Sequence, residues 1–148
     1  MTALPKLHFP PVKLRARQQE GQVEVWDDLR RIYLVLTPEE WVRRHLIEFL
    51  ISDCAAPPKR IMQEYAVALN GQPQRADVVV VDHAGQPLLL AECKSAEVAI
   101  DDKTLSQAVR YNSVVGARYL ILTNGLAHFC YEYYNGDYRS LPDFPLLG

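Results

Sequence analysis

Residues 76–94 read ADVVVVDHAGQPLLLAECK, and this stretch decides the fold. Two short apolar runs flank a polar loop that contains a glycine and a proline, which is typical of a β-hairpin. Both runs are almost continuously apolar, so we expect protein to cover both faces of the hairpin. If Val81 pairs with Leu88, the antiparallel register places Asp77 directly opposite Glu92, with both side chains on one face.

The charged residues at the open end of this hairpin predict a metal site. Lys94 follows Glu92 by two residues, so it lies on the same face of its strand. Two opposed carboxylates repel each other and are costly to bury, whereas Mg²⁺ prefers carboxylate oxygens and would neutralise them. We expect Asp77, Glu92 and the backbone carbonyl of Cys93 to bind the metal, and Lys94 to assist metal-dependent phosphodiester hydrolysis. The alternative is a structural salt bridge from Lys94 to either carboxylate.

The sequence on both sides of the hairpin predicts further helices and strands. Thr37 and Pro38 are typical of a helix start, because threonine caps the first turn and proline fits it. The expected elements are a hairpin at 13–27, a strand or helix approach at 32–36, a helix from 38 to before Pro57, a short helix or turn at 58–63, strands at 64–69 and 119–123, a helix at 104–115 and a hairpin at 127–141. This order predicts an α/β fold with a mixed sheet flanked by helices and additional strands at both termini.

Length and composition predict one globular domain. The chain has 148 residues, of which 49% are hydrophobic, and a net charge of −2. We expect N-terminal strands and an extension at 1–36, a core at 37–126, and a C-terminal hairpin and tail at 127–148. No apolar run is long enough to span a membrane, and the N-terminus lacks the pattern of a secretory signal. We therefore expect a cytoplasmic protein without a membrane partner.

The cysteines bear on zinc binding, and the basic residues bear on nucleic-acid binding. Cys54, Cys93 and Cys130 form no CxxC pair, so we expect buried thiols rather than a zinc site. The acidic balance argues against strong nonspecific binding of nucleic acid. Basic residues nevertheless gather in the first fifth of the chain, where they predict either a local nucleic-acid contact or a solvated strand face. They are Lys6, Lys13, Arg15, Arg17, Arg30 and Arg31.

Two helices carry further candidate site residues. Gln107 and Tyr111 are four residues apart, so they share one face of the predicted second helix. That polar face either looks toward the site or is simply solvated. Glu39 and Glu40 lie in the opening turn of the first helix, where a carboxylate can reach the metal through a water. The alternative is that both only stabilise the helix N-terminus.

Several motifs occur in a fixed order along nearly the whole chain. They are Thr37 to Arg43 (TPEEWVR), Arg75 to Asp77 (RAD), Glu92 to Lys94 (ECK), Gln107 with Tyr111 and Asn112, and Thr123 to Gly125 (TNG). Together they resemble the N-terminal nuclease domain of type I restriction enzyme R proteins, most closely its short stand-alone members. That family is part of the PD-(D/E)xK nuclease superfamily, so the resemblance implies a restriction-endonuclease-like core.

The resemblance also implies roles for individual residues. Asp77 matches the acidic residue of the PD half-motif, with Ala76 in place of the proline, and Glu92 and Lys94 match the ExK half-motif. Gln107 and Tyr111 match a QxxxY element, for which the resemblance implies a role in positioning DNA beside the catalytic site. Glu39 or Glu40 matches an accessory acidic residue in the first helix.

The activity implied by the resemblance is Mg²⁺-dependent hydrolysis of DNA, with Mn²⁺ able to substitute. The implied partners are DNA and restriction-modification subunits, either a methyltransferase or a motor, and a dimer is one option. The chain contains no Walker A motif, so by itself it is not an ATP-driven translocase. A non-catalytic nucleic-acid-binding or assembly module that retains the nuclease fold is the alternative.

Overall fold

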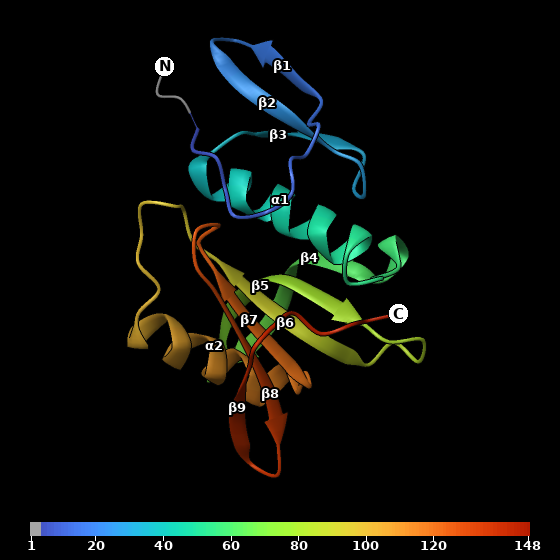
Figure 1. The fold of residues 1–148 in the computed structure, drawn as a ribbon, viewed down its shortest axis with the longest axis vertical. Coiled ribbons are helices and arrows are strands. Elements are labelled where there is room, and N and C mark those ends of the chain that lie inside the picture. Colours follow the sequence, from blue (N-terminus) through green and yellow to red (C-terminus); the bar gives the residue numbers. More distant parts are fainter. Residues whose placement is uncertain (1–3) are drawn as a thin grey trace.

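A computed structural model describes residues 4–148, so the first three residues of the predicted N-terminal extension lie outside the described part. Residues 4–148 form two sheets and two α-helices (Figure 1). The elements are β1 (Ala16–Gln19), β2 (Gln22–Asp27), β3 (Ile32–Val35), α1 (Pro38–Ser52), the short 3₁₀ helix η1 (Pro58–Arg60), β4 (Ile61–Leu69), β5 (Gln72–Val81), β6 (Pro87–Cys93), α2 (Asp102–Val115), β7 (Tyr119–Thr123), β8 (His128–Tyr134) and β9 (Asp137–Leu141).

The larger sheet is mixed, as predicted. Its six strands lie in the order β4-β5-β6-β7-β8-β9. Only β6 and β7 pair in parallel, and α2 forms the crossover between them, whereas the other neighbours are antiparallel. The C-terminal hairpin β8–β9 extends this sheet. The N-terminal strands instead form a separate three-stranded sheet in the order β1-β2-β3.

The register predicted for the central hairpin is confirmed along most of its length. Val79 pairs with Leu90, and the pairs on either side keep the same register. The predicted pair of Val81 with Leu88 is wrong, because the register shifts after Val80 and Val81 pairs with Pro87. The loop explains the shift: the Asp82 carboxylate accepts hydrogen bonds from the backbone N–H groups of Ala84 and Gln86, which closes a tight turn before the proline.

Each face of this sheet buries its own apolar cluster. The cluster beside α1 includes Val78 and Leu89, whereas the cluster beside α2 includes Val79 and Leu90. All four side chains are fully buried. Successive residues of a strand point to opposite faces, so both layers are needed to cover the hairpin. The sequence prediction that protein covers both faces is confirmed.

Local signals set the helix boundaries. The Thr37 hydroxyl accepts a hydrogen bond from the backbone N–H of Glu40 at 3.0 Å, which caps α1. Helix α2 begins at Asp102, two residues before the predicted start, with Asp101 as its cap, and Gly116 ends it with a φ of 75°. The strand predicted at 64–69 begins earlier, at Ile61, because that side chain is buried against the α1 cluster.

The N-terminal part of the chain lies on the far side of α1 from the main sheet. Figure 1 shows β1, β2 and β3 above the helix and the extended N-terminal segment passing across it. This segment is anchored near the end of β7, where the backbone N–H of His8 donates to the carbonyl of Gly125 at 2.7 Å. A side chain on Gly125 would collide with Leu7, which lies within 2.6 Å of the position a Cβ would take.

Two expectations from composition can be compared with the structure. Cys54, Cys93 and Cys130 are buried free thiols, as predicted. Neither α-helix in residues 4–148 combines the length and apolar composition needed to cross a membrane.

Replacing Val79 by aspartate is expected to prevent folding, because the side chain is fully buried between β5 and α2. An unpaired buried charge costs several kcal/mol, a large part of the roughly 5–15 kcal/mol by which a domain is stable. Met62→Asp is the control: Met62 pairs with Val79 but is 45% exposed. Circular dichroism and thermal melting measure both, and a Val79→Asp variant that melts normally would contradict this packing.

Candidate functional site

Strands β5 and β6 part at the position of the two predicted carboxylates. The regular pairing ends with Val78 and Ala91, one pair before Asp77 and Glu92. Beyond it, the backbone N–H of Cys93 donates to the Asp77 carboxylate at 2.8 Å instead of to a strand carbonyl. On its other side β6 stays paired with β7 as far as Cys93. The Asp77 side chain therefore replaces the backbone ladder where the strands separate.

The pairing of β5 with its other neighbour, β4, is also irregular at the position of Asp77. The pairing between β4 and β5 includes Gln63 with Val78 and Tyr65 with Ala76, but skips the residues between them. Glu64, the skipped residue of β4, has a φ of 52°. A non-glycine residue in this region costs roughly 1–3 kcal/mol and is often found near functional sites. Strand β5 is thus distorted on both edges where it presents its acidic side chain.

Glu92 is a buried carboxylate with an unsatisfied oxygen. It is 9% exposed, and in the described part of the chain its Oε1 atom has no hydrogen-bond partner. Burial raises the pKa of Glu92 strongly, and the neighbouring Asp77 raises it further. A buried oxygen without a donor is expensive unless a cation or a bound water meets it. This donor set therefore fits a divalent cation shared between the two carboxylates.

Lys94 does not form the structural salt bridge considered above as the alternative. Its positive charge lowers the pKa of Glu92 and partly offsets the effects of burial and of Asp77. In residues 4–148, however, the Lys94 ammonium takes part in no hydrogen bond and in no salt bridge. The backbone N–H of Lys94 donates to the carbonyl of Thr123 at 2.9 Å, which fixes the main chain but leaves the side chain free.

Side-chain ligands alone do not define a metal site. Within residues 4–148, no group of three or more His, Cys, Asp or Glu side chains is arranged to hold a metal ion. The ligand set predicted from the sequence contains only two carboxylates, those of Asp77 and Glu92, with the Cys93 carbonyl as third ligand. The metal at this position consequently stays a prediction.

The first turn of α1 brings one further carboxylate to the site. Burial raises the pKa of Glu39, the Asp77 charge raises it further, and the Lys94 charge partly offsets both. Glu40 is buried and accepts hydrogen bonds from Arg43 at 3.0 Å and from Arg44 at 2.9 Å. The Glu40 oxygens are thus engaged by arginines, whereas Glu39 is exposed and forms no salt bridge within residues 4–148.

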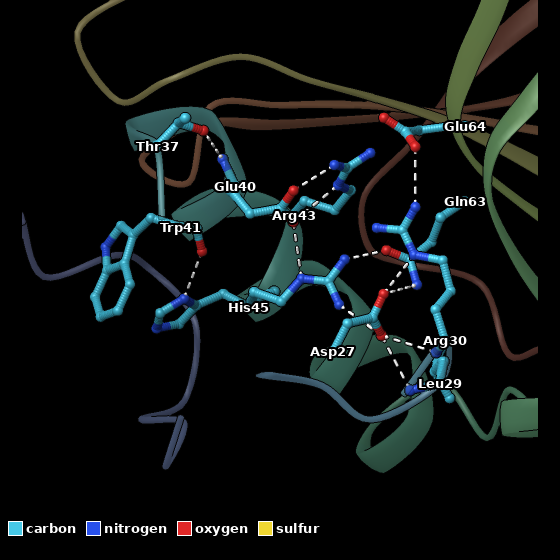
Figure 2. A network of polar contacts seen from close by, with 11 residues as sticks. Asp27, Leu29, Arg30, Thr37, Glu40, Trp41, Arg43, His45, Gln63 and Glu64 are labelled. Atoms are coloured by element: carbon cyan, nitrogen blue, oxygen red, sulfur yellow. Dashed lines mark hydrogen bonds and ion pairs between the residues drawn. The ribbon is translucent and has the colours of Figure 1, made fainter. Parts of the chain in front are cut away.

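Arg44 belongs to a buried network that sequence reasoning missed (Figure 2). Its guanidinium pairs with Asp27 at 3.0 Å and with Glu40 at 2.9 Å, and also binds Gln63. Asp27 is fully buried; burial alone would raise its pKa, but hydrogen bonds from Arg30 and the charge of Arg44 lower it. The network joins β2, α1 and β4. The spacing of Glu40 and Arg44 could have indicated their pairing, but no sequence signal indicated Asp27.

Gln107 and Tyr111 do share a helix face, as predicted. The Gln107 amide donates to the Tyr111 hydroxyl at 2.9 Å, and that hydroxyl donates to Gln74 of β5 at 3.2 Å. Tyr111 is otherwise buried in the α2 cluster. In the described part of the chain neither side chain hydrogen-bonds to the carboxylates or to Lys94. The pair attaches α2 to β5 three residues before Asp77.

The TNG motif shapes the loop that follows Lys94. The Asn124 side chain accepts from the backbone N–H groups of Leu126 and Ala127 and donates to the carbonyl of Val98 at 2.8 Å. The motif thereby ties the loop before α2 to the end of β7.

Comparison with known proteins identifies the family of this chain. The family model described as the N terminus of type I restriction enzyme R proteins (HSDR_N) matches residues 38–145. The chain therefore belongs to this family. No curated protein matches the sequence.

Two solved structures are similar to this chain, and the first of them supports the fold. One is a fragment of a protein assigned as the HsdR subunit of a type I restriction enzyme from Vibrio vulnificus YJ016. It has 21% identity and a TM-score of 0.58 over 76% of this chain and 24% of that one. The type IIG restriction endonuclease BpuSI has 17% identity over 74% of this chain and 12% of that one, with a TM-score of 0.39, too low to carry an argument. The present chain thus spans about a quarter of the HsdR fragment.

Glu92→Gln is expected to stabilise the metal-free protein at neutral pH. The folded-state pKa of Glu92 lies above its ordinary value of 4.5, so its ionisation destabilises the fold increasingly as pH rises above that value. The variant lacks this penalty, and its advantage in melting temperature should be larger at pH 8 than at pH 4. Thermal melts in EDTA measure this, with Glu97→Gln on the exposed loop as the control. An advantage independent of pH would argue against a buried, ionisable Glu92.

Glu40→Gln and Glu39→Gln should separate the two acidic residues of the first turn. Removing the Glu40 charge leaves Arg44 with a weaker set of partners in a buried position, and breaking such a pair costs roughly 3–5 kcal/mol. Glu39 forms no salt bridge in residues 4–148, so its replacement should leave stability nearly unchanged. Urea unfolding measures both, and equal losses would contradict the distinction.

Proposed function

We propose that the chain hydrolyses DNA phosphodiester bonds with Mg²⁺ as cofactor, at a site formed by Asp77, Glu92 and Lys94. The observation that supports this most strongly is the buried, unpartnered Glu92 oxygen beside Asp77. Membership of the type I restriction R protein family supports a nuclease-related role. The activity, the substrate and the restriction-modification partners of the longer relatives are part of the proposal, since the chain spans only a part of them.

The residues that would hold the metal are Asp77, Glu92 and the carbonyl of Cys93. Mg²⁺ favours oxygen ligands, and when bound it would polarise a phosphoryl oxygen and help to ionise a water. The protein supplies the orientation of this set. The Cys93 N–H fixes one Asp77 oxygen, and the pairing of β6 with β7 fixes the backbone that carries Glu92. One oxygen of Glu92 remains free to serve as a ligand.

Lys94 and Glu39 would act on the reacting groups. The Lys94 ammonium has no carboxylate within salt-bridge distance in residues 4–148, so it is free to orient the attacking water and to stabilise negative charge on the phosphate. Glu39, from the first turn of α1, would accept a hydrogen bond from that water. Gln107 and Tyr111 would not act on the reacting groups directly. They would hold α2 against β5, and the Gln107 amide would contact the DNA.

Incubation of the purified protein with supercoiled plasmid and linear single-stranded DNA tests the proposal. We expect cleavage with Mg²⁺ or Mn²⁺ and none with EDTA. Asp77→Ala and Lys94→Ala should each lower the rate by at least a hundredfold, because each removes a group that acts on the reacting phosphate. Glu39→Gln should lower the rate less, and Glu40→Gln should act mainly through stability.

Lys59→Ala is the matched control, because Lys59 is an exposed lysine on η1, beyond the C-terminal end of α1 and thus at the opposite end of that helix from Glu39. It should cleave like the native protein. Calorimetry with Mn²⁺ separates the remaining outcomes. Metal binding that is lost in Asp77→Asn, without cleavage of either DNA, would mean that the site needs another subunit. Absence of both metal binding and cleavage would contradict the proposal and favour a non-catalytic module with the nuclease fold.

A further inference from the structure

The outer face of the three-stranded sheet carries a row of arginines on aromatic rings. Trp26 pairs directly with Tyr33, and their ring centroids lie 5.0 Å apart. On the other side of β2, the backbone N–H of Trp26 donates to the carbonyl of Arg15. Directly paired residues point to the same face, so these three side chains lie side by side across the sheet.

This face points away from the body of the protein. Val25 and Asp27, the neighbours of Trp26 on β2, are fully buried, and Asp27 binds Arg44 of α1. Side chains alternate along a strand, so Trp26 lies on the opposite side of the sheet from α1. The same face includes Arg17, two residues from Arg15 on the same edge of the sheet.

Three guanidinium groups lie on the two rings. The guanidinium carbon of Arg17 is 3.8 Å from the centroid of Tyr33, and those of Arg15 and Arg31 are 5.1 and 5.9 Å from Trp26. Stacking on a ring orients a guanidinium while its N–H donors stay available in the plane of the group. We name Arg15, Arg17, Arg31, Trp26 and Tyr33 the arginine face.

The charges on the arginine face are incompletely neutralised. Arg17 is paired with Glu24 at 2.8 Å, and Asp28 accepts a hydrogen bond from the Trp26 indole at 3.2 Å. In residues 4–148, Arg15 and Arg31 have no salt-bridge partner. All three arginines are exposed, in a chain whose overall net charge is −2. Oriented, exposed guanidinium groups are suited to phosphate oxygens.

We propose that the arginine face binds the phosphate backbone of the DNA substrate; the inference rests on the proposed function for the identity of that substrate. Contacts to phosphates carry no base sequence, so the face supplies affinity and orientation. The partly buried rings are covered by guanidinium groups, which favours contact with phosphates over stacking with bases.

Fluorescence anisotropy with a short labelled DNA duplex tests the proposal, using the full chain in EDTA so that cleavage plays no part. Replacing Arg15, Arg17 and Arg31 together by glutamine removes their charge but keeps the long side-chain stems. We expect affinity to fall on the order of tenfold or more at low salt, and the slope of log affinity against log salt to decrease by about 2–3. Arg15→Gln alone, which disturbs no salt bridge, should give a smaller loss in the same direction.

The matched control replaces Arg118 and Arg139 by glutamine. These arginines also lie over tyrosine rings, at 5.0 Å from Tyr119 and 4.8 Å from Tyr134, but on the main sheet. The control should bind DNA like the native protein, and thermal melting should show that all variants are folded. Equal affinity of the native protein and the triple variant, or no binding of DNA by the native protein at low salt, would overturn the inference.

Two further outcomes separate this inference from the proposed function. Arginine-dependent binding of DNA by a protein that neither cleaves DNA nor binds Mn²⁺ would support the arginine face and contradict the nuclease. Cleavage of DNA by a protein whose DNA binding does not depend on the three arginines would support the nuclease and contradict the arginine face. Polyglutamate of comparable length serves as the probe for an acidic protein partner. If it binds as tightly as DNA, with the same dependence on the arginines, the assignment to DNA is wrong.

Discussion

The buried ion pairs of Arg44 are the interaction on which the arrangement of the layers depends. One guanidinium contacts Asp27 from the three-stranded sheet, Glu40 from its own helix and Gln63 from the main sheet. A charge in this position is tolerated only because its donors are met. The turn of α1 that carries Glu40 also carries Glu39, so the placement of this candidate carboxylate depends on a network of structural ion pairs.

The site itself combines a rigid frame with an unsatisfied group. Strands β5 and β6 are held between two apolar layers up to the point where they part, and there the Asp77 side chain takes the place of a strand carbonyl. The unpartnered oxygen of Glu92 is expensive for the folded protein alone. Natural proteins retain unsatisfied buried groups mainly at functional positions, where a bound ligand offsets their cost in free energy.

The parts of the structure that local sequence patterns determine could be predicted from the sequence. The register assumed for the hairpin is confirmed from Val78 to Val80, and Asp77 and Glu92 follow one position beyond the last regular pair, where the strands part. The shift at Pro87 was missed because it depends on side-chain hydrogen bonds within the loop. The difference between Glu39 and Glu40 could not be predicted either. Both fit a helix N-terminus equally well, and only the three-dimensional position of the arginines separates them.

The ion pair between Asp27 and Arg44 bears on where this structural domain begins. The family model starts at residue 38, so it omits the strand that carries this carboxylate. A fragment cut at that point would keep every motif of the hairpin and of α2, yet it would leave Arg44 without one of its buried counter-charges. The set of residues joined through Arg44 is therefore larger than the segment that similarity detects, because it includes Asp27 of β2.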